Sequence, residues 1–258
     1  MAQPHDPAAY ALSLGLDPER LPRHIAVIMD GNGRWAVEQS RPRVDGHLQG
    51  AEVVRAITSE CCRLGVRQLT LYCFSVENWK RPPDEIAFLM ALLKQFLQSE
   101  RQLIAEQNIR LAIIGRQAGI PPDVLAEMQE SIRLASQHTG MTLCLAINYG
   151  GRAELVDACQ GIARQVQAGE LDPDAIDEAT VADALYTADM PEPDLLIRTA
   201  GEMRISNFLL WQISYTELWV TPECWPDFRP EHLHDALRDF ARRRRRFGGL
   251  NDLCGAPE

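Results

Sequence analysis

The sequence predicts an α/β fold in which helices flank a central, mostly parallel sheet of six strands. Short apolar runs alternate with long amphipathic segments along the whole 258 residues, which is typical of right-handed β-α-β crossovers. Runs such as LTLYCF and LAIIG lack polar alternation, as expected for strands that are covered on both faces. No internal repeat, low-complexity tract or long Gly/Ser linker interrupts this pattern, so we expect a single domain.

Each element follows from a local pattern. The first strand is expected where the run IAVIM stops at an aspartate, and similar apolar runs predict strands at 24–29, 68–74, 109–114, 142–148, 194–198 and 216–221. Amphipathic periodicity predicts helices at 47–63, 84–107, 123–138, 151–168, 174–186 and 231–246. The second of these begins after paired prolines with acidic residues in its first turn, and the last ends in a cationic turn before Phe-Gly-Gly.

The domain is expected to span residues 22–250. Residues 1–21 are predicted to be a partly flexible N-terminal segment, and residues 251–258 a C-terminal tail.

Composition narrows the class of protein. The net charge of −10 argues against a nucleic-acid binder that works by global electrostatics, so an anionic ligand needs a local cationic site. Seven cysteines without a C-x-x-C pair favour free thiols in a reducing cytoplasm over disulfides or zinc. We see no signal peptide and no apolar run near the roughly 18 residues of a membrane span. We therefore expect a cytoplasmic protein that meets lipid, if at all, from the cytosolic side.

The stretch IAVIMDGNGRW at 25–35 is the most informative part of the chain. Ligands of open α/β sheets gather beyond the carboxyl ends of the strands. Gly31 and Gly33 allow the backbone close to an anion, Asp30 offers an oxygen ligand for Mg²⁺, and Arg34 offers a fork suited to phosphate. The alternative is a tight turn in which Asp30 only caps the next helix.

Two further groups of polar residues adjoin this turn in the predicted fold. SVENWKRP at 75–82 follows the second strand and packs Ser, Glu, Asn, Trp and Arg into a few positions, which favours a site over a plain surface loop. Arg43 and His47 follow the first motif, and His47 is expected at the start of a helix, where an anion is favoured. A simple helix cap is the alternative for His47.

A second cationic pocket is predicted from residues 194–219. The strand at 194–198 ends on Arg198, and Arg204 and Ser206 follow in the loop. Glu217 then offers a second carboxylate for a metal. Two cationic pockets with acidic residues between them suggest two phosphorylated substrates that are brought together for a reaction.

Two other segments are open to more than one interpretation. The run RRRRR at 242–246 is interpreted as a solvated or interface face rather than a nucleic-acid site, because it closes a helix in an acidic protein. The helix at 84–107 is apolar over a wide arc, which favours burial in the core, although a helix of this kind also suits the wall of an apolar cavity.

Several motifs together resemble one enzyme family. DGNGRWA at 30–36, RVDGHLQG at 43–50, LYCFSVENWKRP at 71–82, NYGGR at 148–152 and RTAGEMRISNFLLWQ at 198–212, followed by WPDF, resemble the cis-prenyltransferases, most closely those of the bacterial undecaprenyl diphosphate type. The resemblance covers roughly residues 22–250, in order and with short gaps. No Asp-Asp-x-x-Asp pair occurs, so the trans-prenyl synthases are not indicated.

The resemblance implies an activity and an assembly. It implies that isopentenyl diphosphate units are condensed onto farnesyl diphosphate to give a long-chain polyprenyl diphosphate, undecaprenyl diphosphate, the lipid-carrier precursor for cell-wall synthesis. It also implies Mg²⁺, a homodimer, and a hydrophobic tunnel for the growing chain. Contact with a membrane would be at most peripheral, for product release, and no nucleic acid is expected.

The resemblance also assigns residue roles. Asp30, Asn78 and His47 are implied to be catalytic, and Asp30 and Glu217 to hold the metal. Substrate binding is implied for Gly31, Asn32, Gly33, Arg34, Trp35, Arg43, His47, Ser75, Glu77, Asn78, Trp79, Arg81, Arg198, Arg204 and Ser206. Met141 and Leu93 are implied to line the tunnel and limit product length. The residues leave open whether Asn78 with His47, or the released diphosphate, accepts the proton.

One residue departs from the family pattern. Met203 lies between Glu202 and Arg204, where some members carry a histidine near the metal. A thioether is a poor ligand for Mg²⁺, so metal binding is expected to depend on Asp30 and Glu217.

Three rival functions remain. A shorter-chain cis-prenyl synthase would share these motifs. A non-catalytic subunit of the same fold would be expected to lose Asp30 or Asn78, and both are present. A nucleotide-binding α/β enzyme is disfavoured, because its glycine-rich motifs are absent.

Overall fold

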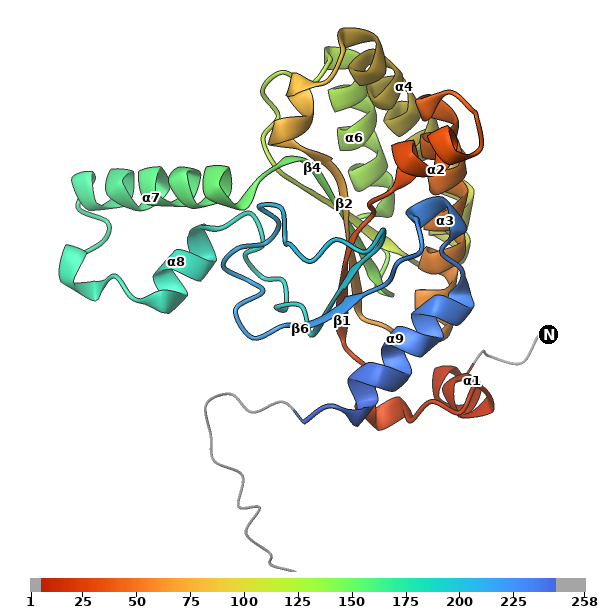
Figure 1. Ribbon diagram of the computed structural model, residues 1–258. Helices are drawn as coiled ribbons and strands as arrows, with labels where there is room; N and C mark the ends of the chain where they lie inside the picture. Colours follow the sequence, from red (N-terminus) through yellow and green to blue (C-terminus); the bar gives the residue numbers. More distant parts are fainter. Residues whose placement is uncertain (1–5, 245–258) are drawn as a thin grey trace, which may run out of the picture.

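A computed structural model describes residues 6–244 of the chain (Figure 1). Its core is one sheet of six strands in the order β3-β4-β2-β1-β5-β6, and every neighbouring pair is parallel. The strands are β1 His24–Ile28, β2 Gln68–Ser75, β3 Arg110–Ile114, β4 Thr142–Tyr149, β5 Leu195–Arg198 and β6 Glu217–Val220. The predicted single α/β domain with a parallel six-stranded sheet is confirmed.

The helices follow the predicted order with several corrected bounds. They are α1 Pro7–Ser13, α2 Asn32–Glu38, α3 Arg43–Arg63, α4 Pro83–Ser99, α5 Arg101–Glu106, α6 Pro122–Ala135, α7 Gly151–Gln167, α8 Glu178–Ala184 and α9 Pro230–Arg242. Short 3₁₀ turns occupy η1 Pro18–Arg20, η2 Val76–Lys80, η3 Pro173–Ala175 and η4 Trp225–Asp227.

Three of the predicted helices are wrong in their bounds. The helix at 84–107 is divided at Glu100, which is buried and accepts hydrogen bonds from Arg55 of α3. The helix at 174–186 is divided where the Asp177 side chain caps a new helix. α3 begins at Arg43, so His47 lies in its second turn and not at its start. Helix α2 was missed, because asparagine and glycine in its first turn are poor helix formers.

Both chain ends lie partly outside the described residues. Residues 7–20, within the segment that we expected to be partly flexible, form α1 and η1 with Ala11 and Leu16 buried. The tail at 251–258 and the last two arginines of the run at 242–246 lie outside the described residues. Within the described part, no helix is long and apolar enough to cross a membrane.

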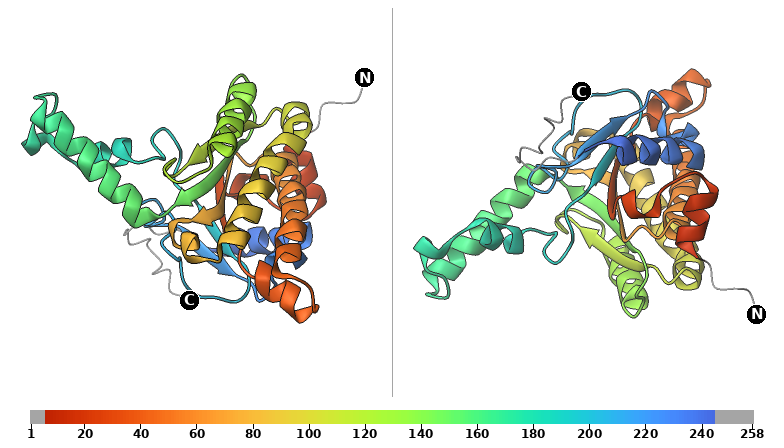
Figure 2. Two further views of the ribbon diagram at one scale, coloured as in Figure 1. Left: turned by 90° about the horizontal axis from the view of Figure 1, so that it is seen from above. Right: turned by 90° about the horizontal axis from the view of Figure 1, so that it is seen from below.

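The two faces of the sheet are covered differently. Alternate β1 residues point to opposite faces, as strand geometry requires. Ile25 and Val27 join the larger apolar cluster with α3, α4, α6 and α9. Ala26 and Ile28 join a smaller cluster around Phe208, in the irregular segment after β5. Helix α7 projects away from the body, with α8 beside it (Figures 1 and 2).

The strand register brings the predicted functional segments to one edge. Ile28 of β1 pairs with Arg198 of β5, and Ser75 of β2 pairs with Tyr149 of β4. All strands run the same way, so the segments after Ile28, Ser75, Tyr149 and Arg198 leave the sheet at the same edge.

Candidate active site

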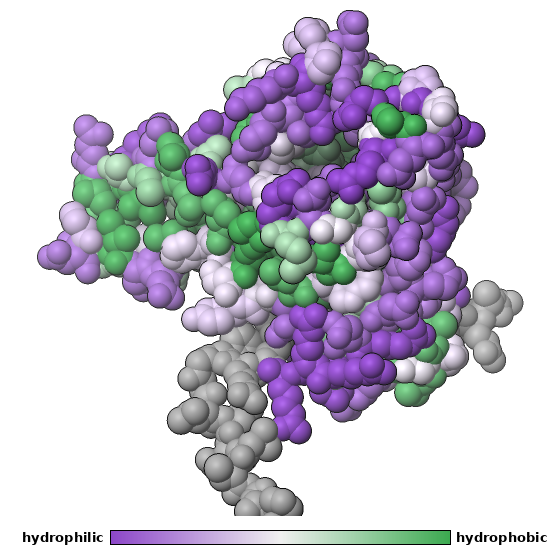
Figure 3. Space-filling model, in the orientation of Figure 1, coloured by the Kyte–Doolittle hydropathy of each residue, from purple (hydrophilic) through white to green (hydrophobic). Residues whose placement is uncertain are grey.

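A cavity of about 630 Å³ opens beside this carboxyl edge, between the sheet and helices α3 and α4. The hollow is visible near the top of the space-filling view in Figure 3. Its polar lining comes from strand ends, loops, the turn η2 and one residue each of α2 and α3: Asp30, Asn32, His47, Ser75, Glu77, Asn78, Arg81, Arg198, Ser206 and Asn207. Its apolar lining includes Ala51, Val54, Leu89, Met90, Leu92, Leu93, Phe96 and Leu145. Helix α4, whose apolar arc alone favoured core burial and whose Leu93 the resemblance assigned to a tunnel, therefore forms a wall of this cavity.

The turn after β1 is held in a single arrangement. The backbone N–H of Asp30 donates to Thr199 Oγ1 at 2.9 Å, and the Thr199 hydroxyl donates to the Asp30 carbonyl at 2.7 Å. Gly31 has φ +97°, and a Cβ there would lie 2.8 Å from Cys224 Sγ, so only glycine fits. Gly31, and not Asp30, is the N-cap of α2. The alternative in which Asp30 caps the helix is therefore wrong.

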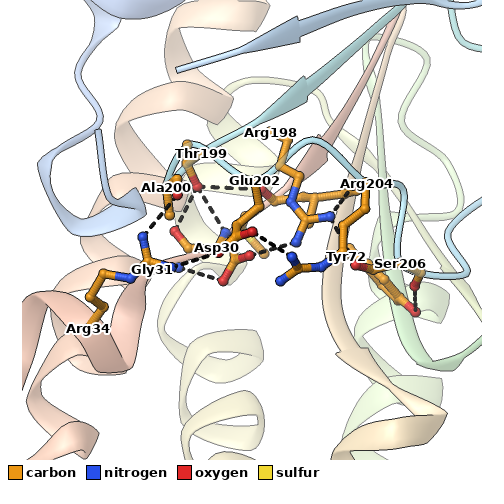
Figure 4. Close-up of polar contacts among 12 residues, drawn as sticks. Asp30, Gly31, Arg34, Tyr72, Arg198, Thr199, Ala200, Glu202, Arg204 and Ser206 are labelled. Carbon is orange, nitrogen blue, oxygen red and sulfur yellow. Dashed lines mark hydrogen bonds and ion pairs between the residues drawn. The ribbon is translucent and has the colours of Figure 1, made fainter. Parts of the chain in front are cut away.

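Asp30 is joined to Arg198 by the central ion pair of the site (Figure 4). Arg198 Nη2 donates to Asp30 Oδ2 at 2.7 Å, and Gly31 N–H donates to Oδ1 at 2.8 Å. Arg198 is 5% exposed and Asp30 34% exposed at the side chain. Asp30 therefore faces the cavity while its buried partner supports it from behind.

Arg198 also organises the loop that follows β5. Its Nη1 donates to Ser206 Oγ at 2.9 Å and to the Arg204 carbonyl. The Tyr72 hydroxyl donates to the Ser206 carbonyl at 3.4 Å, and the Tyr72 ring stacks on Phe208 at 4.4 Å. Two residues of the predicted second pocket, Arg198 and Ser206, are thereby held together beside Asp30.

Arg34, in the motif after β1, and Arg43, at the start of α3, extend to different parts of the site. Arg34 turns toward the β5 loop, where it donates to the Ala200 carbonyl and to Glu202 Oε1, both at 3.0 Å (Figure 4). Glu202 also pairs with Arg204 at 2.5 Å. Arg43 instead lies against Gly33, where a Cβ would come within 2.6 Å of its guanidinium. Neither Arg34 nor Arg204 lines the cavity in this arrangement.

Four predicted site residues carry buried polar atoms without a partner. These atoms are Asn32 Oδ1, Trp35 Nε1, His47 Nε2 and Arg198 Nε, among eight such atoms in residues 6–244. Buried polar groups are normally hydrogen-bonded, so such a concentration at one site indicates groups reserved for a ligand. The sequence-predicted site coincides with this concentration.

His47 is a neutral group in this setting. Burial, with a smaller contribution from the positive charges of Arg81 and Arg43 and against the opposing charge of Glu85, lowers the pKa of His47 to about 4. Its Nε2 lies 3.9 Å from Glu85 Oε1, too far for a hydrogen bond. His47 therefore presents an uncharged imidazole to the cavity at neutral pH.

The 75–81 loop presents one side to the cavity. Ser75, Glu77, Asn78 and Arg81 line it, whereas Trp79 does not. Asn78 Oδ1 accepts from the Ser75 N–H at 3.0 Å, and Arg81 pairs with Glu85 at 2.9 Å. Trp79 instead donates from Nε1 to Asn148 and packs against Phe74, which lines the cavity, so its contact with substrate stays a prediction.

Glu217 does not join Asp30 in one chain, so the predicted shared metal site is wrong as far as this chain is concerned. Glu217 begins β6 and pairs with Leu195, whereas Arg198, whose side chain reaches Asp30, pairs with Val220. Three residues of strand separate these levels by roughly 10 Å. Glu217 instead accepts a hydrogen bond from Arg243 at 2.9 Å. Met203, whose side chain is 82% exposed, lies clear of the cavity.

The two residues implied to limit chain length lie at different depths. Leu93 lines the cavity. Met141 precedes β4 at the opposite end of the sheet, is buried, and contacts Cys62, with the two sulfurs 4.0 Å apart. It belongs to the main apolar cluster but not to the lining.

Sequence reasoning missed several residues of this site. Tyr72 and Asn207 both line the cavity, and Asn207 Nδ2 donates to Glu77 Oε1 at 2.8 Å. Tyr72 lies in the motif LYCF and Asn207 in the motif RISN. Membership of these motifs was the sequence signal that could have identified them as site residues.

Asp30 is the residue that fits a magnesium ion. No group of three metal-ligating side chains occurs within residues 6–244. Mg²⁺ is commonly held by one or two carboxylates together with substrate phosphates and water, so a single half-exposed carboxylate beside cationic groups is compatible with it.

Comparison with known proteins agrees with this geometry. A family model described as "Putative undecaprenyl diphosphate synthase" matches residues 28–248. The isoprenyl transferase of Geobacter sulfurreducens is 50% identical over 234 residues, covering 91% of this chain and 95% of that protein. That of Bacillus subtilis is 46% identical over 230 residues, covering 89% and 88%.

Solved structures give the same result. Lavandulyl diphosphate synthase from Lavandula x intermedia, in complex with dimethylallyl diphosphate, superposes with a TM-score of 0.88 and 39% identity, covering 90% of this chain and 100% of that one. A probable undecaprenyl diphosphate synthase from Campylobacter jejuni gives 0.73 and 30%, covering 88% and 99%. The chain therefore belongs to the cis-prenyltransferase family of the undecaprenyl diphosphate synthase type, and it is a prenyltransferase.

Proposed function

We propose that this prenyltransferase condenses isopentenyl diphosphate units onto farnesyl diphosphate to make undecaprenyl diphosphate, a lipid-carrier precursor for cell-wall synthesis in the cytoplasm. The observation that supports it is the junction of two polar groups at the Asp30–Arg198 pair, directly above an apolar cavity. An amphiphilic primer needs both parts: polar groups for its diphosphate and an apolar wall for its chain.

The primer is assigned to the α3 side of the junction. His47 and Asn32 supply unpaired buried polar atoms to the lining there, and the Arg43 side chain, from the start of α3, lies against Gly33 of α2 outside the lining. The apolar faces of α3 and α4 receive the hydrocarbon. Isopentenyl diphosphate is assigned to the other side, to Arg198, Arg204 and Ser206.

The chemistry needs electrostatic stabilisation more than a strong base. The allylic C–O bond breaks, the alkene of isopentenyl diphosphate attacks C1 of the primer, and a proton leaves C2. Negative charge grows on the departing diphosphate, where preorganised cations lower the barrier. Two unit charges about 4 Å apart interact by roughly 4 kcal/mol at an effective dielectric near 20.

We assign particular residues to metal binding and to proton transfer. Asp30 would hold Mg²⁺, which supplies charge neutralisation at the diphosphate when bound. Neutral His47 has an unpaired ring nitrogen that suits proton acceptance, with Asn78 positioning the isopentenyl group. The released diphosphate is the alternative acceptor.

We assign the interface of a homodimer to the side of the molecule that carries α7 and α8. Apolar side chains cover the arm formed by α7 and α8 in Figure 3, where Val156 is 50% exposed and Ile176 39% exposed. The edge strand β6 adds Leu218, which is 47% exposed. A second copy of the chain is the proposed cover for these side chains, because monomers rarely expose such continuous apolar surface.

A shorter product is a second candidate. The cavity of about 630 Å³ lies in the usual range for a small-ligand site, and its lining stops at Phe96 and Leu145. A long chain has to pass these residues before it meets Met141. The length of the product therefore depends on how far the cavity extends into the main apolar cluster toward Met141.

The direct test is incubation with farnesyl diphosphate, labelled isopentenyl diphosphate and Mg²⁺, with separation of the lipids by length. We expect a ladder that ends at undecaprenyl diphosphate. Asp30→Ala should lower kcat by about 100-fold or more while primer affinity changes only a few-fold, since the carboxylate would hold the Mg²⁺ that neutralises charge developing on the diphosphate. A kcat within a few-fold of wild type would contradict the role of Asp30.

The two-pocket assignment is tested by Arg204→Ala. Loss of one charge-assisted hydrogen bond, about 1.5–3 kcal/mol, should raise the KM for isopentenyl diphosphate roughly 10- to 100-fold and leave that for farnesyl diphosphate near wild type. Arg229→Ala, an exposed arginine outside the cavity, is the control. Equal effects on both substrates would rule out separate pockets.

The protonation state of His47 is tested by NMR titration of its ring, assigned with His47→Gln. The free protein should show a pKa of about 4, because burial disfavours the charged imidazolium. Unfolded chains protonate histidine near 6.5, so this group destabilises the fold progressively as the pH falls from 6.5 toward 4. Inorganic diphosphate should raise the pKa. A value near 6.5 without ligand would refute the neutral assignment.

A further inference from the structure

Asn148 lies behind the cavity, near the end of β4, in an unusual setting. It is 4% exposed and has φ +49°, in the left-handed region that asparagine tolerates better than most residues. It does not line the cavity. No role in binding or catalysis has so far been given to it.

The Asn148 side chain connects two loops that are distant in sequence. Its Oδ1 accepts from Trp79 Nε1 at 2.7 Å, and its Nδ2 donates to the carbonyls of Arg116 at 2.9 Å and Ala118 at 3.0 Å. An amide is the side chain that offers one acceptor and two donors in this geometry. All three bonds are used to hold the 75–81 loop against the loop after β3.

Trp79 transmits this anchor to the cavity. Its ring packs edge-on against Phe74 with centroids 5.0 Å apart, and Gly119 lies beside it. Trp79 belongs to η2, the same short turn that carries Glu77 and Asn78 into the cavity lining. A shift of Trp79 therefore shifts Asn78, its immediate neighbour in the chain.

The other attachments of the loop lie where a substrate would compete. Glu77 is bound to Asn207, and Arg81 to Glu85, and both loop residues line the cavity. Apart from the backbone pairing of Ser75 with Tyr149 in the sheet, the Trp79–Asn148 bond is the side-chain hydrogen bond within residues 6–244 that joins this loop to the body with both partners outside the cavity lining. It is the attachment that a bound diphosphate leaves intact.

We propose that Asn148 is a positioning residue: through its hydrogen bond to Trp79 it fixes the 75–81 loop, so that Asn78 and Arg81 are held at the reacting groups. The inference rests on the proposed function. Misplacement of reacting groups by about 1 Å costs roughly 100-fold in rate. Loss of the anchor should therefore act on kcat more than on primer affinity.

The test compares Asn148→Gly, which keeps the left-handed backbone, with Trp79→Phe, which keeps an aromatic ring, though a smaller one, and removes the N–H donor, and with the double variant. Asn108→Gly is the matched control. Asn108 also has a left-handed φ, of +54°, and its side chain holds Thr139 at the other end of the sheet. The readouts are kcat, the KM for farnesyl diphosphate, and the rate of trypsin cleavage after Lys80, because Pro82 protects the bond after Arg81.

We expect Asn148→Gly to lower kcat by about 10- to 100-fold with a KM within a few-fold of wild type, and to accelerate cleavage after Lys80. The double variant should be no slower than Asn148→Gly alone, since both changes remove one interaction. Asn108→Gly should leave kcat and cleavage unchanged.

Three results would overturn the proposal. Unchanged cleavage would show that Asn148 does not anchor the loop, and faster cleavage with unchanged kcat would show that the anchor does not position catalysis. Independent, additive losses in the double variant would show that the two residues act separately. If wild-type protein fails to elongate farnesyl diphosphate, the proposed function fails, and the cleavage assay still tests the anchor.

Discussion

The ion pair between Asp30 and Arg198 is the interaction on which the site depends. It joins the ends of two adjacent parallel strands at 2.7 Å, with the arginine buried and the aspartate half-exposed. A buried guanidinium without a partner is strongly destabilising, so Asp30 is needed even before any ligand binds. Arg198 also holds the loop of Ser206, and Asp30 is bound to Gly31 in the turn before α2. One pair thus sets the relation between two binding regions.

The sheet separates the polar and apolar requirements of a lipid-transferring enzyme. On the helix side, α3 and α4 leave an apolar cavity that a hydrocarbon chain fits. On the opposite face, Phe208 and Tyr72 pack together and hold the loop after β5, which fixes the position of its polar residues relative to the sheet. The carboxyl edge lies between these two regions, and the proposed function places the headgroups of both substrates there.

The strands and the location of the site were predictable, because buried parallel strands have a plain apolar signal and their carboxyl ends share one edge. The directions in which the side chains point were not predictable. Arg34 follows Gly33 in sequence yet turns toward Ala200, and Trp79 bonds to Asn148 behind the cavity although Asn78, directly before it, lines the cavity. Such directions depend on left-handed turns and tertiary partners. Glu217 was misplaced for a similar reason: its distance from Asp30 depends on strand register, which the motif does not contain.

The central claim is that each chain holds two diphosphates at once, on either side of Asp30 and Arg198. Equilibrium binding of isopentenyl diphosphate, with and without an unreactive thio analogue of farnesyl diphosphate and in the presence of Mg²⁺, measures this most directly. The account predicts one molecule of each ligand per chain, with isopentenyl diphosphate still bound when the analogue is saturating. Competition between the two for a single site would contradict it.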